Sequence, residues 1–177
     1  AALPSGIDVF MCATGFKERL DILESVNWNG ENLWLTGFWP NVDEKSPLAP
    51  YTQNIIVRNE ALPKLYRESK INLNVHRTRR VWKHDGADQE HIAETAYSLG
   101  PRVYEILASG GFLLTDYRDE AREFLVDGTD YVTYEDAADL QDKLAFFLQH
   151  DDERNQIADN GLLAVQDCTF GSRCNDI

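Results

Sequence analysis

Short apolar runs alternate with amphipathic stretches along most of the chain. The apolar runs predict buried strands, and they occupy residues 7–13, 32–37, 55–57, 71–75, 112–116 and 131–134. Between them, apolar side chains recur every three or four positions. This spacing predicts helices over residues 16–26, 60–69, 119–126, 137–149 and 153–165, and a further helix that begins at Pro101 and stops at Gly110-Gly111. Residues 78–99 form a polar insertion in which we expect only a short helix near residues 89–97.

Strands separated by helices of about ten residues predict right-handed βαβ crossovers. The expected fold class is therefore α/β, a Rossmann-like doubly wound parallel sheet with helices on both faces. An α+β domain with a mixed sheet stays open as the alternative. We expect one domain over residues 1–167 and a C-terminal tail over residues 168–177. Because ligands of such sheets lie outside the carboxyl ends of the strands, the candidate site comprises the loops over residues 14–19, 76–80 and 98–105.

Composition narrows the class of protein to a globular one. Of 177 residues, 43% are hydrophobic and 27% are charged, which is unlike a disordered chain. No apolar stretch approaches the roughly 20 residues of a bilayer span, and no secretion signal is visible at the N-terminus. Three cysteines, an odd count, favour a reduced cytoplasmic chain, although a bond between Cys168 and Cys174 stays open. Because the sequence does not begin with methionine, we expect a processed or excised fragment.

The charge is unevenly distributed along the chain. A net charge of -13 argues against nucleic-acid binding through the general surface of this domain. Residues 58–84, however, carry 8 basic and only 2 acidic side chains, whereas residues 101–177 carry 6 basic and 17 acidic ones. A local basic stretch inside an acidic protein indicates a site for a small anion. The alternative is a solvated helix face followed by a basic loop.

The most informative stretch covers residues 98–116. Gly100-Pro101 opens a helix, and the unpaired backbone N–H groups and positive dipole of a helix start attract an anion. Arg102 stands in the first turn, where a cation is disfavoured unless an anion such as pyrophosphate pairs with it. Glu105, one turn further, has the carboxylate that a vicinal diol requires as acceptor. The alternatives are a solvent-facing Glu105 and an ion pair of Arg102 with Glu105 or Asp116.

Residues 102–116, with the sequence RVYEILASGGFLLTD, resemble the donor-site motif of GT-B glycosyltransferases, most closely the CgeB-like group. Looser similarity extends over residues 7–173 and includes residues 123–128, 153–158 and 169–173. The resemblance implies the C-terminal half of a GT-B fold, in which the glutamate matching Glu105 binds the nucleotide ribose. The wider group 1 pattern has a second glutamate for the donor sugar, eight positions earlier. Tyr97 stands there in this chain, so the way in which the sugar is held departs from the pattern.

Three further segments supply candidate residues. In the first strand-to-helix turn, Gly15 permits close backbone approach, and Lys17 and Arg19 can reach a phosphate. The resemblance implies that this loop contacts phosphate, with Arg19 favoured over Lys17; ordinary surface charges are the alternative. It also implies that residues 56–58, including Val57 and Arg58, lie near the nucleobase.

His76 and Arg77 follow the fourth strand at the edge of the sheet where ligands bind, and they are the catalytic candidates. Arg77 would stabilise the departing diphosphate, and His76 would donate a hydrogen bond to the sugar or phosphate. A structural histidine is the alternative. His84 and His91, with acidic residues between them, fit no common zinc spacing. GT-B enzymes generally hold the diphosphate with basic groups and helix dipoles, so the resemblance implies no metal and no cofactor beyond the donor substrate.

Together these features predict a glycosyltransferase that moves a sugar from a nucleotide diphosphate sugar to an unknown acceptor. The resemblance favours retention of anomeric configuration. It also implies that the acceptor surface comes from an N-terminal GT-B domain outside this chain, so we expect the fragment alone to be inactive. Two alternatives stay open: a noncatalytic module that binds a nucleotide sugar or a glycan, and another GT-B enzyme such as a sugar-nucleotide epimerase.

Overall fold

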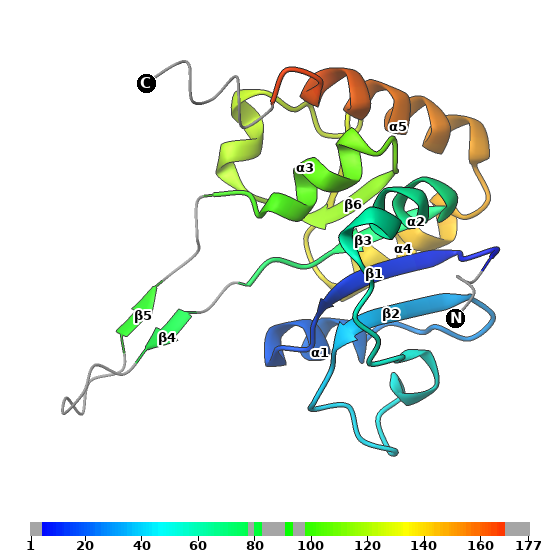
Figure 1. Cartoon of the computed structure of the whole chain (residues 1–177), viewed down its shortest axis with the longest axis vertical. Coiled ribbons are helices and arrows are strands. Elements are labelled where there is room, and N and C mark those ends of the chain that lie inside the picture. The colour runs from blue at the N-terminus through cyan, green and yellow to red at the C-terminus, as the bar shows by residue number, and fades with distance from the viewer. Residues whose placement is uncertain (1–4, 78–79, 83–90, 94–97, 169–177) are drawn as a thin grey trace.

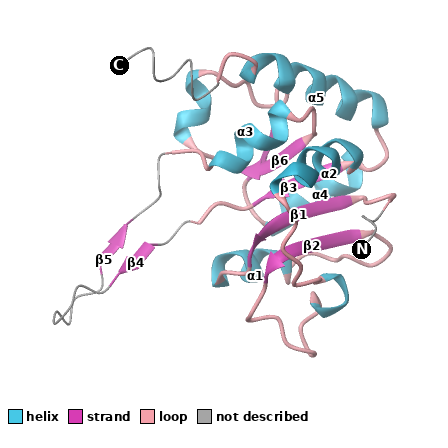
Figure 2. Cartoon of the chain, viewed as in Figure 1, coloured by secondary structure: helices cyan, strands magenta, loops and turns pink. Residues whose placement is uncertain are grey.

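The computed structural model describes residues 5–77, 80–82, 91–93 and 98–168. Its centre is a five-stranded sheet in the order β2-β1-β3-β6-β7, in which all neighbours are parallel. Figure 1 shows this sheet between layers of helices, and Figure 2 shows the same view by type of element. The strands are β1 (Val9–Thr14), β2 (Leu33–Phe38), β3 (Ile71–Asn74), β6 (Leu113–Asp116) and β7 (Val132–Tyr134). Two short antiparallel strands, β4 (Arg80–Trp82) and β5 (His91–Ala93), form a separate ribbon.

Helices follow most of the strands of the sheet. The α-helices are α1 (Lys17–Leu23), α2 (Leu62–Glu68), α3 (Pro101–Ala108), α4 (Ala137–Phe147) and α5 (Asp151–Val165). Three 3-10 helices join them: η1 (Ala49–Tyr51), η2 (Asn59–Ala61) and η3 (Asp119–Glu123).

Both faces of the sheet are buried, and alternate strand residues face opposite layers. Val9 and Met11 pack with the buried side chains of α1 and α4, whereas Phe10 packs with those of α2 and α3. Along β6, Leu114 belongs to the first layer and Leu113 to the second. This arrangement confirms the doubly wound α/β fold predicted from the sequence. The mixed-sheet alternative is wrong for these five strands, because all their pairings are parallel.

The strand predicted over residues 55–57 does not form. Asn54 has a φ of 45°, which breaks the extended backbone just before the run. Only an isolated bridge joins Leu35 to Thr52, and Ile55 contributes its carbonyl to Gly37 N–H and to the Thr36 hydroxyl. Ile56 is 86% exposed and lies outside the core, whereas Val57 is half-buried and packs against it.

Two helix predictions are also wrong. Residues 119–126 were expected to be helical, but the structure has a 3-10 helix that ends at Glu123, because Phe124 leaves the helical backbone region at φ -151° and ψ -4°. Of the short helix expected near residues 89–97, residues 91–93 instead form β5, where Ile92 pairs with Val81 of β4; residues 89–90 and 94–97 lie outside the described residues. Antiparallel pairing with a distant segment thus prevails over the local pattern.

Cys12 and Cys168 are free thiols, and burial raises the pKa of the Cys12 thiol. Cys174 lies outside the described residues. Within the described part of the chain, no helix combines the length and the apolar composition that a membrane crossing requires.

Candidate functional site

The strand order changes direction beside β1, and the carboxyl edge of the sheet at this point is called the crevice below. From β1 the chain first moves to β2 on one side, and then crosses to β3 on the other side. Parallel sheets bind ligands at such a switch point, outside the carboxyl ends of the strands. The segments at that edge begin after Thr14, Asn74 and Asp116, the last residues of β1, β3 and β6. Two of the three predicted loops leave from these ends, and the third leads into α3.

The start of α3 lies directly against His76. Gly100 is the N-cap, Pro101 occupies the first turn, and no side chain caps the helix. A Cβ placed on Gly100 would lie 3.6 Å from His76 Cδ2 and 3.9 Å from its Nε2, which is ordinary contact. The structure therefore brings together two candidates that are far apart in the sequence. The backbone N–H groups of the first turn of α3 have no capping side chain, and they lie beside one edge of the His76 imidazole ring.

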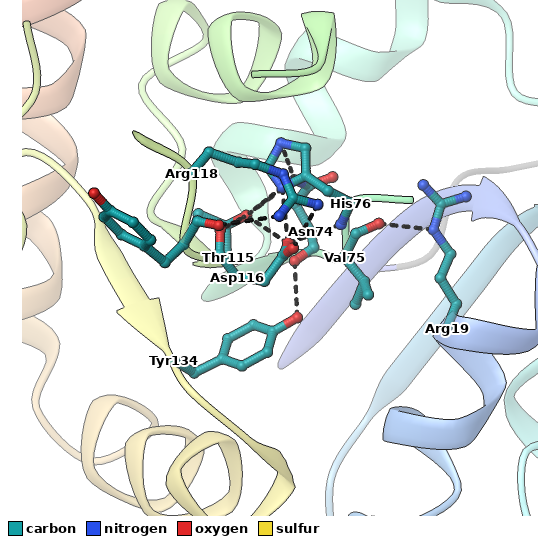
Figure 3. Close-up of polar contacts among 9 residues, drawn as sticks. Arg19, Asn74, Val75, His76, Thr115, Asp116, Arg118 and Tyr134 are labelled. Atoms are coloured by element: carbon teal, nitrogen blue, oxygen red, sulfur yellow. Dashed lines mark hydrogen bonds and ion pairs between the residues drawn. The ribbon is translucent and has the colours of Figure 1, made fainter. Parts of the chain in front are cut away.

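His76 is held by Asp116 across the neighbouring strand (Figure 3). The backbone N–H of His76 donates to Asp116 Oδ1 at 2.7 Å, and the ring Nδ1 lies 2.8 Å from the same oxygen. Asn74 Nδ2 lies 3.3 and 3.4 Å from the two ring nitrogens and donates to the Thr115 hydroxyl at 3.0 Å. Burial acts to raise the pKa of Asp116, but the hydrogen bonds and charge of His76, together with Arg118, outweigh it and lower that pKa. The carboxyl group is therefore ionised near neutral pH.

Arg118 lies on the other side of Asp116 and is only 6% exposed. Its Nη2 is 3.2 Å from Asp116 Oδ2, and its Nη1 donates to the Tyr117 carbonyl at 3.2 Å. Its Nε and Nη2 have no hydrogen-bond partner of good geometry among the described residues. The sequence did not identify Asp116 or Arg118 as a site residue. Asp116 is a charged residue at the carboxyl end of a strand, and this position is a signal that could have identified it.

Arg19 holds together the ends of two strands. It is 8% exposed, and it donates from Nε to the Val75 carbonyl and from Nη1 to the Thr14 carbonyl, each at 2.8 Å (Figure 3). Burial, and then the charge of Arg102, lower the pKa of Arg19 to about 10, so it stays charged. Two of its nitrogens are thus engaged in fixing β1 against the segment after β3. This structural contribution is additional to the phosphate contact expected of Arg19.

The two other candidates of the first turn differ in their surroundings. A Cβ on Gly15 would lie 2.6 Å from Trp39 Cε3, so a packing requirement already explains this glycine. Lys17 is 82% exposed and pairs with Asp21 at 2.6 Å, one turn further along α1. Lys17 therefore points into solvent, and a ligand would have to compete with Asp21 for it.

Two arginine side chains lie near the aromatic ring of Phe16, beside this turn. The guanidinium carbon of Arg77 lies 4.3 Å from the centre of the Phe16 ring, and that of Arg19 lies 5.4 Å from it. Such cation–π contacts orient guanidinium groups while leaving their N–H edges available. Arg77 is exposed, so its edge is accessible to a ligand at the crevice. Phe16 is a residue that sequence reasoning missed, since an apolar residue at a helix start reads as core.

Glu105 faces a groove between α2 and α3 and is exposed. The groove has a volume of about 390 Å³ and begins at Asn59, next to Arg58. Val57 is half-buried against the core just before it. Glu105 therefore lines this groove, whereas Val57 and Arg58 directly precede its first lining residue in the sequence. The groove is lined by Asn59, Leu62, Pro63, Tyr66, Arg67, Glu105, Ala108 and Ser109.

The charge of Arg102 acts on residues of three neighbouring elements. It acts to lower the pKa of Arg19 in α1, of the Cys12 thiol in β1 and of the Tyr66 hydroxyl in α2. The Arg102 Nε and the Tyr66 hydroxyl are buried without a hydrogen-bond partner of good geometry. Burial raises the pKa of Tyr66 to about 12, with Arg102 acting in the opposite direction. Among the described residues, Arg102 forms neither of the ion pairs considered above, with Glu105 or Asp116.

Several candidates lie elsewhere or outside the described residues. Tyr97 is outside them, as are His84 and the acidic residues between it and His91. Within the described residues, no group of three or more metal-binding side chains is found. A smaller pocket of about 190 Å³, bordered by Arg67, Lys70 and Arg154, lies at the opposite, amino edge of the sheet. The strand-end rule favours the crevice over this second pocket.

The fold defines a class: a doubly wound α/β domain, here with Arg19, Arg77 and Arg118 near the carboxyl edge of its sheet. Residues 18–177 match the model of the glycosyl transferase-like family, and the chain belongs to that family. A comparison with curated proteins finds no match.

Solved structures agree with this assignment at the level of fold. The C-terminal domain of the group 1 glycosyl transferase LpcC from Francisella tularensis is 16% identical, with a TM-score of 0.59 over 93% of this chain and 86% of that one. HepE from Anabaena in complex with UDP is 12% identical, with a TM-score of 0.59 over 90% of this chain and 44% of that one. A DNA-modifying β-glucosyltransferase, studied with and without uridine diphosphoglucose, is 14% identical, with a TM-score of 0.60 over 93% and 47%. The chain spans less than half the length of the last two proteins, and its fold is that of a GT-B C-terminal domain.

Proposed function

We propose that this chain is the donor-binding domain of a glycosyltransferase and binds a nucleoside diphosphate sugar across the crevice and the groove. The observation that carries the proposal is the uncapped start of α3 at Gly100, which packs on His76 at the carboxyl edge of the sheet. HepE was solved with UDP, and the β-glucosyltransferase with uridine diphosphoglucose; both share this fold. The family membership and these ligands support the same chemistry here.

Each part of the donor has a matching part of the site. The diphosphate would accept hydrogen bonds from the first turn of α3, which opens with Gly100-Pro101, and from Arg77 beside Phe16. The ribose diol would donate to Glu105, and the base would enter the groove next to Val57 and Arg58. Tyr97, Lys17 and Gly15 are proposed as further contacts on the sequence resemblance alone.

The chemical role follows from where charge develops in the reaction. Glycosyl transfer passes through an oxocarbenium-like state while negative charge builds on the leaving diphosphate. Preorganised donors aimed at that diphosphate lower the barrier directly. Arg77 and His76 are the proposed catalytic residues for this role, and Arg19 fixes the strand ends that present them. The acceptor would be bound by another part of the protein.

Calorimetry with UDP, GDP, ADP and their glucose conjugates tests the proposal. We expect at least one nucleotide to bind this chain, while free glucose does not, because the site's polar groups match phosphate and ribose. Absence of binding by every nucleotide at about millimolar concentration, corresponding to less than roughly 4 kcal/mol of binding free energy, would contradict the proposal. Binding without any transfer by the full-length protein would favour a noncatalytic module. A released, epimerised nucleotide sugar would favour an epimerase.

Nucleotide binding is expected to be independent of divalent metal ions. Arg77, Arg102 and the start of α3 supply the positive charge that magnesium otherwise provides to a diphosphate. The affinity should therefore be the same in EDTA and in magnesium chloride. Binding that EDTA abolishes and magnesium restores would instead assign a metal site to residues outside those the structure describes.

A further inference from the structure

Asp116 has two well-defined neighbours that the proposed donor contacts do not explain. One carboxylate oxygen, Oδ1, receives both the backbone N–H of His76 and the ring Nδ1, at 2.7 and 2.8 Å. The other oxygen, Oδ2, faces Arg118 at 3.2 Å. The three side chains therefore form a line that ends at the imidazole ring against α3 (Figure 3).

This line determines which ring nitrogen of His76 carries its proton. Asp116 is an ionised acceptor, so the neighbouring Nδ1 must be the protonated nitrogen in a neutral ring. The opposite edge, Cδ2–Nε2, faces Gly100 at the start of α3. In the neutral state, the lone pair is therefore on Nε2, which has Asn74 Nδ2 3.4 Å away and borders the start of α3, where a diphosphate would bind.

After His76, Arg118 is the second group that keeps the buried Asp116 charged. A buried cation requires a partner, and Asp116 is the only carboxylate paired with Arg118 among the described residues. Two guanidinium nitrogens of Arg118, Nε and Nη2, have no hydrogen-bond partner of good geometry there, so charge pairing with Asp116 is its main stabilisation. Arg118 consequently favours the ionised carboxylate and limits its rotation.

We propose that Asp116 and Arg118 are positioning residues that hold His76 so that it takes up a proton when a diphosphate binds. In this step, which rests on the proposed function, Nε2 accepts a proton from solvent and, as Nε2–H, donates a hydrogen bond to a phosphate oxygen. The Nδ1–H keeps its hydrogen bond to Asp116, which stabilises the resulting imidazolium. His76 thereby gains a charged donor at the moment at which the ligand brings negative charge.

A bound diphosphate adds negative charge beside Nε2 and therefore favours the imidazolium relative to the ligand-free protein. Tyr134, which donates to the Asn74 carbonyl at 3.2 Å, is neutral because burial raises its pKa well above the usual value. The nearest charged groups are Asp116, which binds Nδ1, Arg118, which pairs with Asp116, and Arg19, which donates to the Val75 carbonyl. The elements around the ring also carry Arg77 on its own loop, Arg102 in α3, and Glu120 of η3, which accepts from Leu99 N–H.

Proton uptake can be measured directly by calorimetry in two buffers of different ionisation enthalpy. The probe is UDP-glucose, or GDP- or ADP-glucose if one of these binds instead. A diphosphate esterified at both ends lacks the phosphate group that titrates near pH 6 in a monoester, which leaves the protein as the source of the signal. We expect proton uptake on binding and an affinity about tenfold higher near pH 6 than near pH 8, where a histidine changes charge.

His76→Gln should abolish both the proton uptake and the pH dependence. His150→Gln is the matched control, because the half-buried His150 ring contacts the Phe146 carbonyl through Nδ1 and stacks on the Phe146 ring, away from the carboxyl edge of the sheet; this variant should behave like the wild type. Donor binding without proton uptake in the wild type would overturn this inference and leave the proposed function intact. Absence of donor binding would instead refute the proposed function.

A double variant, Asp116→Asn with Arg118→Met, tests the positioning role. It keeps the net charge and leaves no single buried charge behind. Proton uptake should fall, and the loss of affinity should be concentrated near pH 6. An equal loss at both pH values, with unchanged proton uptake, would show a merely structural role. Nitrogen-15 shifts of the wild-type His76 ring provide a second measurement: we expect the Nδ1–H tautomer, and an Nε2–H tautomer in the free protein would contradict the proposal.

Discussion

Gly37→Ala is expected to lower the free energy of unfolding by about 2–5 kcal/mol, the sum of a left-handed backbone penalty and a steric clash. Gly37 has a φ of +110°, and a Cβ there would lie 2.1 Å from the carbonyl oxygen of Ala13. That oxygen belongs to β1, an interior strand next to the edge strand β2, and Ala13 pairs directly with Gly37. The backbone cannot move away without breaking the β1–β2 ladder. Urea unfolding of the two proteins measures the difference.

Gly30→Ala is the matched control for this substitution. Gly30 has a similar φ of +97°, but no atom lies within 4 Å of a Cβ placed there. This variant should therefore lose only the backbone contribution, about 1–2 kcal/mol. Equal losses for the two variants would show that the close approach of β2 to Ala13 is relieved by a small shift and does not constrain the strand end.

Much of the fold could be predicted because burial on both faces of a parallel sheet leaves a strong pattern. The run that contains Phe10 and the run that contains Leu113 are apolar on both faces, and both became central strands. The same pattern fails for residues 55–57, where the run is equally apolar but Ile56 is exposed. Whether a short apolar run pairs depends on its backbone neighbours. The positive φ of Asn54 is a tertiary outcome that composition does not reveal.

The candidate site was predictable as a location but less so as a set of contacts. The strand-end rule and the start of α3 were sufficient to place His76 and Gly100 at one edge, and the structure brings them into contact. Partner choice was not predictable. The sequence predicts Arg19 as a phosphate ligand, yet two of its nitrogens donate to backbone carbonyls at 2.8 Å. Asp116 was one possible ion-pair partner of Arg102, but in the structure it binds His76. Such choices depend on which buried groups need partners after folding.

Glu105→Gln is expected to weaken binding of a ribonucleotide by about ten- to a hundredfold. The change keeps the size of the side chain but removes the charge that both ribose hydroxyls would share, and charge-assisted hydrogen bonds contribute about 1.5–3 kcal/mol. Stability should change by less than about 1 kcal/mol, because Glu105 is exposed and interacts with the helix only through its dipole. Calorimetry measures the affinity, and thermal unfolding measures the stability.

The comparison of UDP with 2′-deoxy-UDP, or of the corresponding pair for whichever base binds, isolates the contact with the diol. The deoxy ligand already lacks one donor, so Glu105→Gln should weaken its binding less than that of the ribonucleotide. Glu153→Gln is the matched control, because it removes the same charge from an exposed position in the first turn of α5 and should leave both affinities unchanged. Since both variants alter the net charge equally, a loss seen only at Glu105 cannot come from long-range electrostatics. Equal losses for the two ligands would show that Glu105 does not bind the diol. A large fall in melting temperature with unchanged affinity would assign Glu105 to the stability of α3.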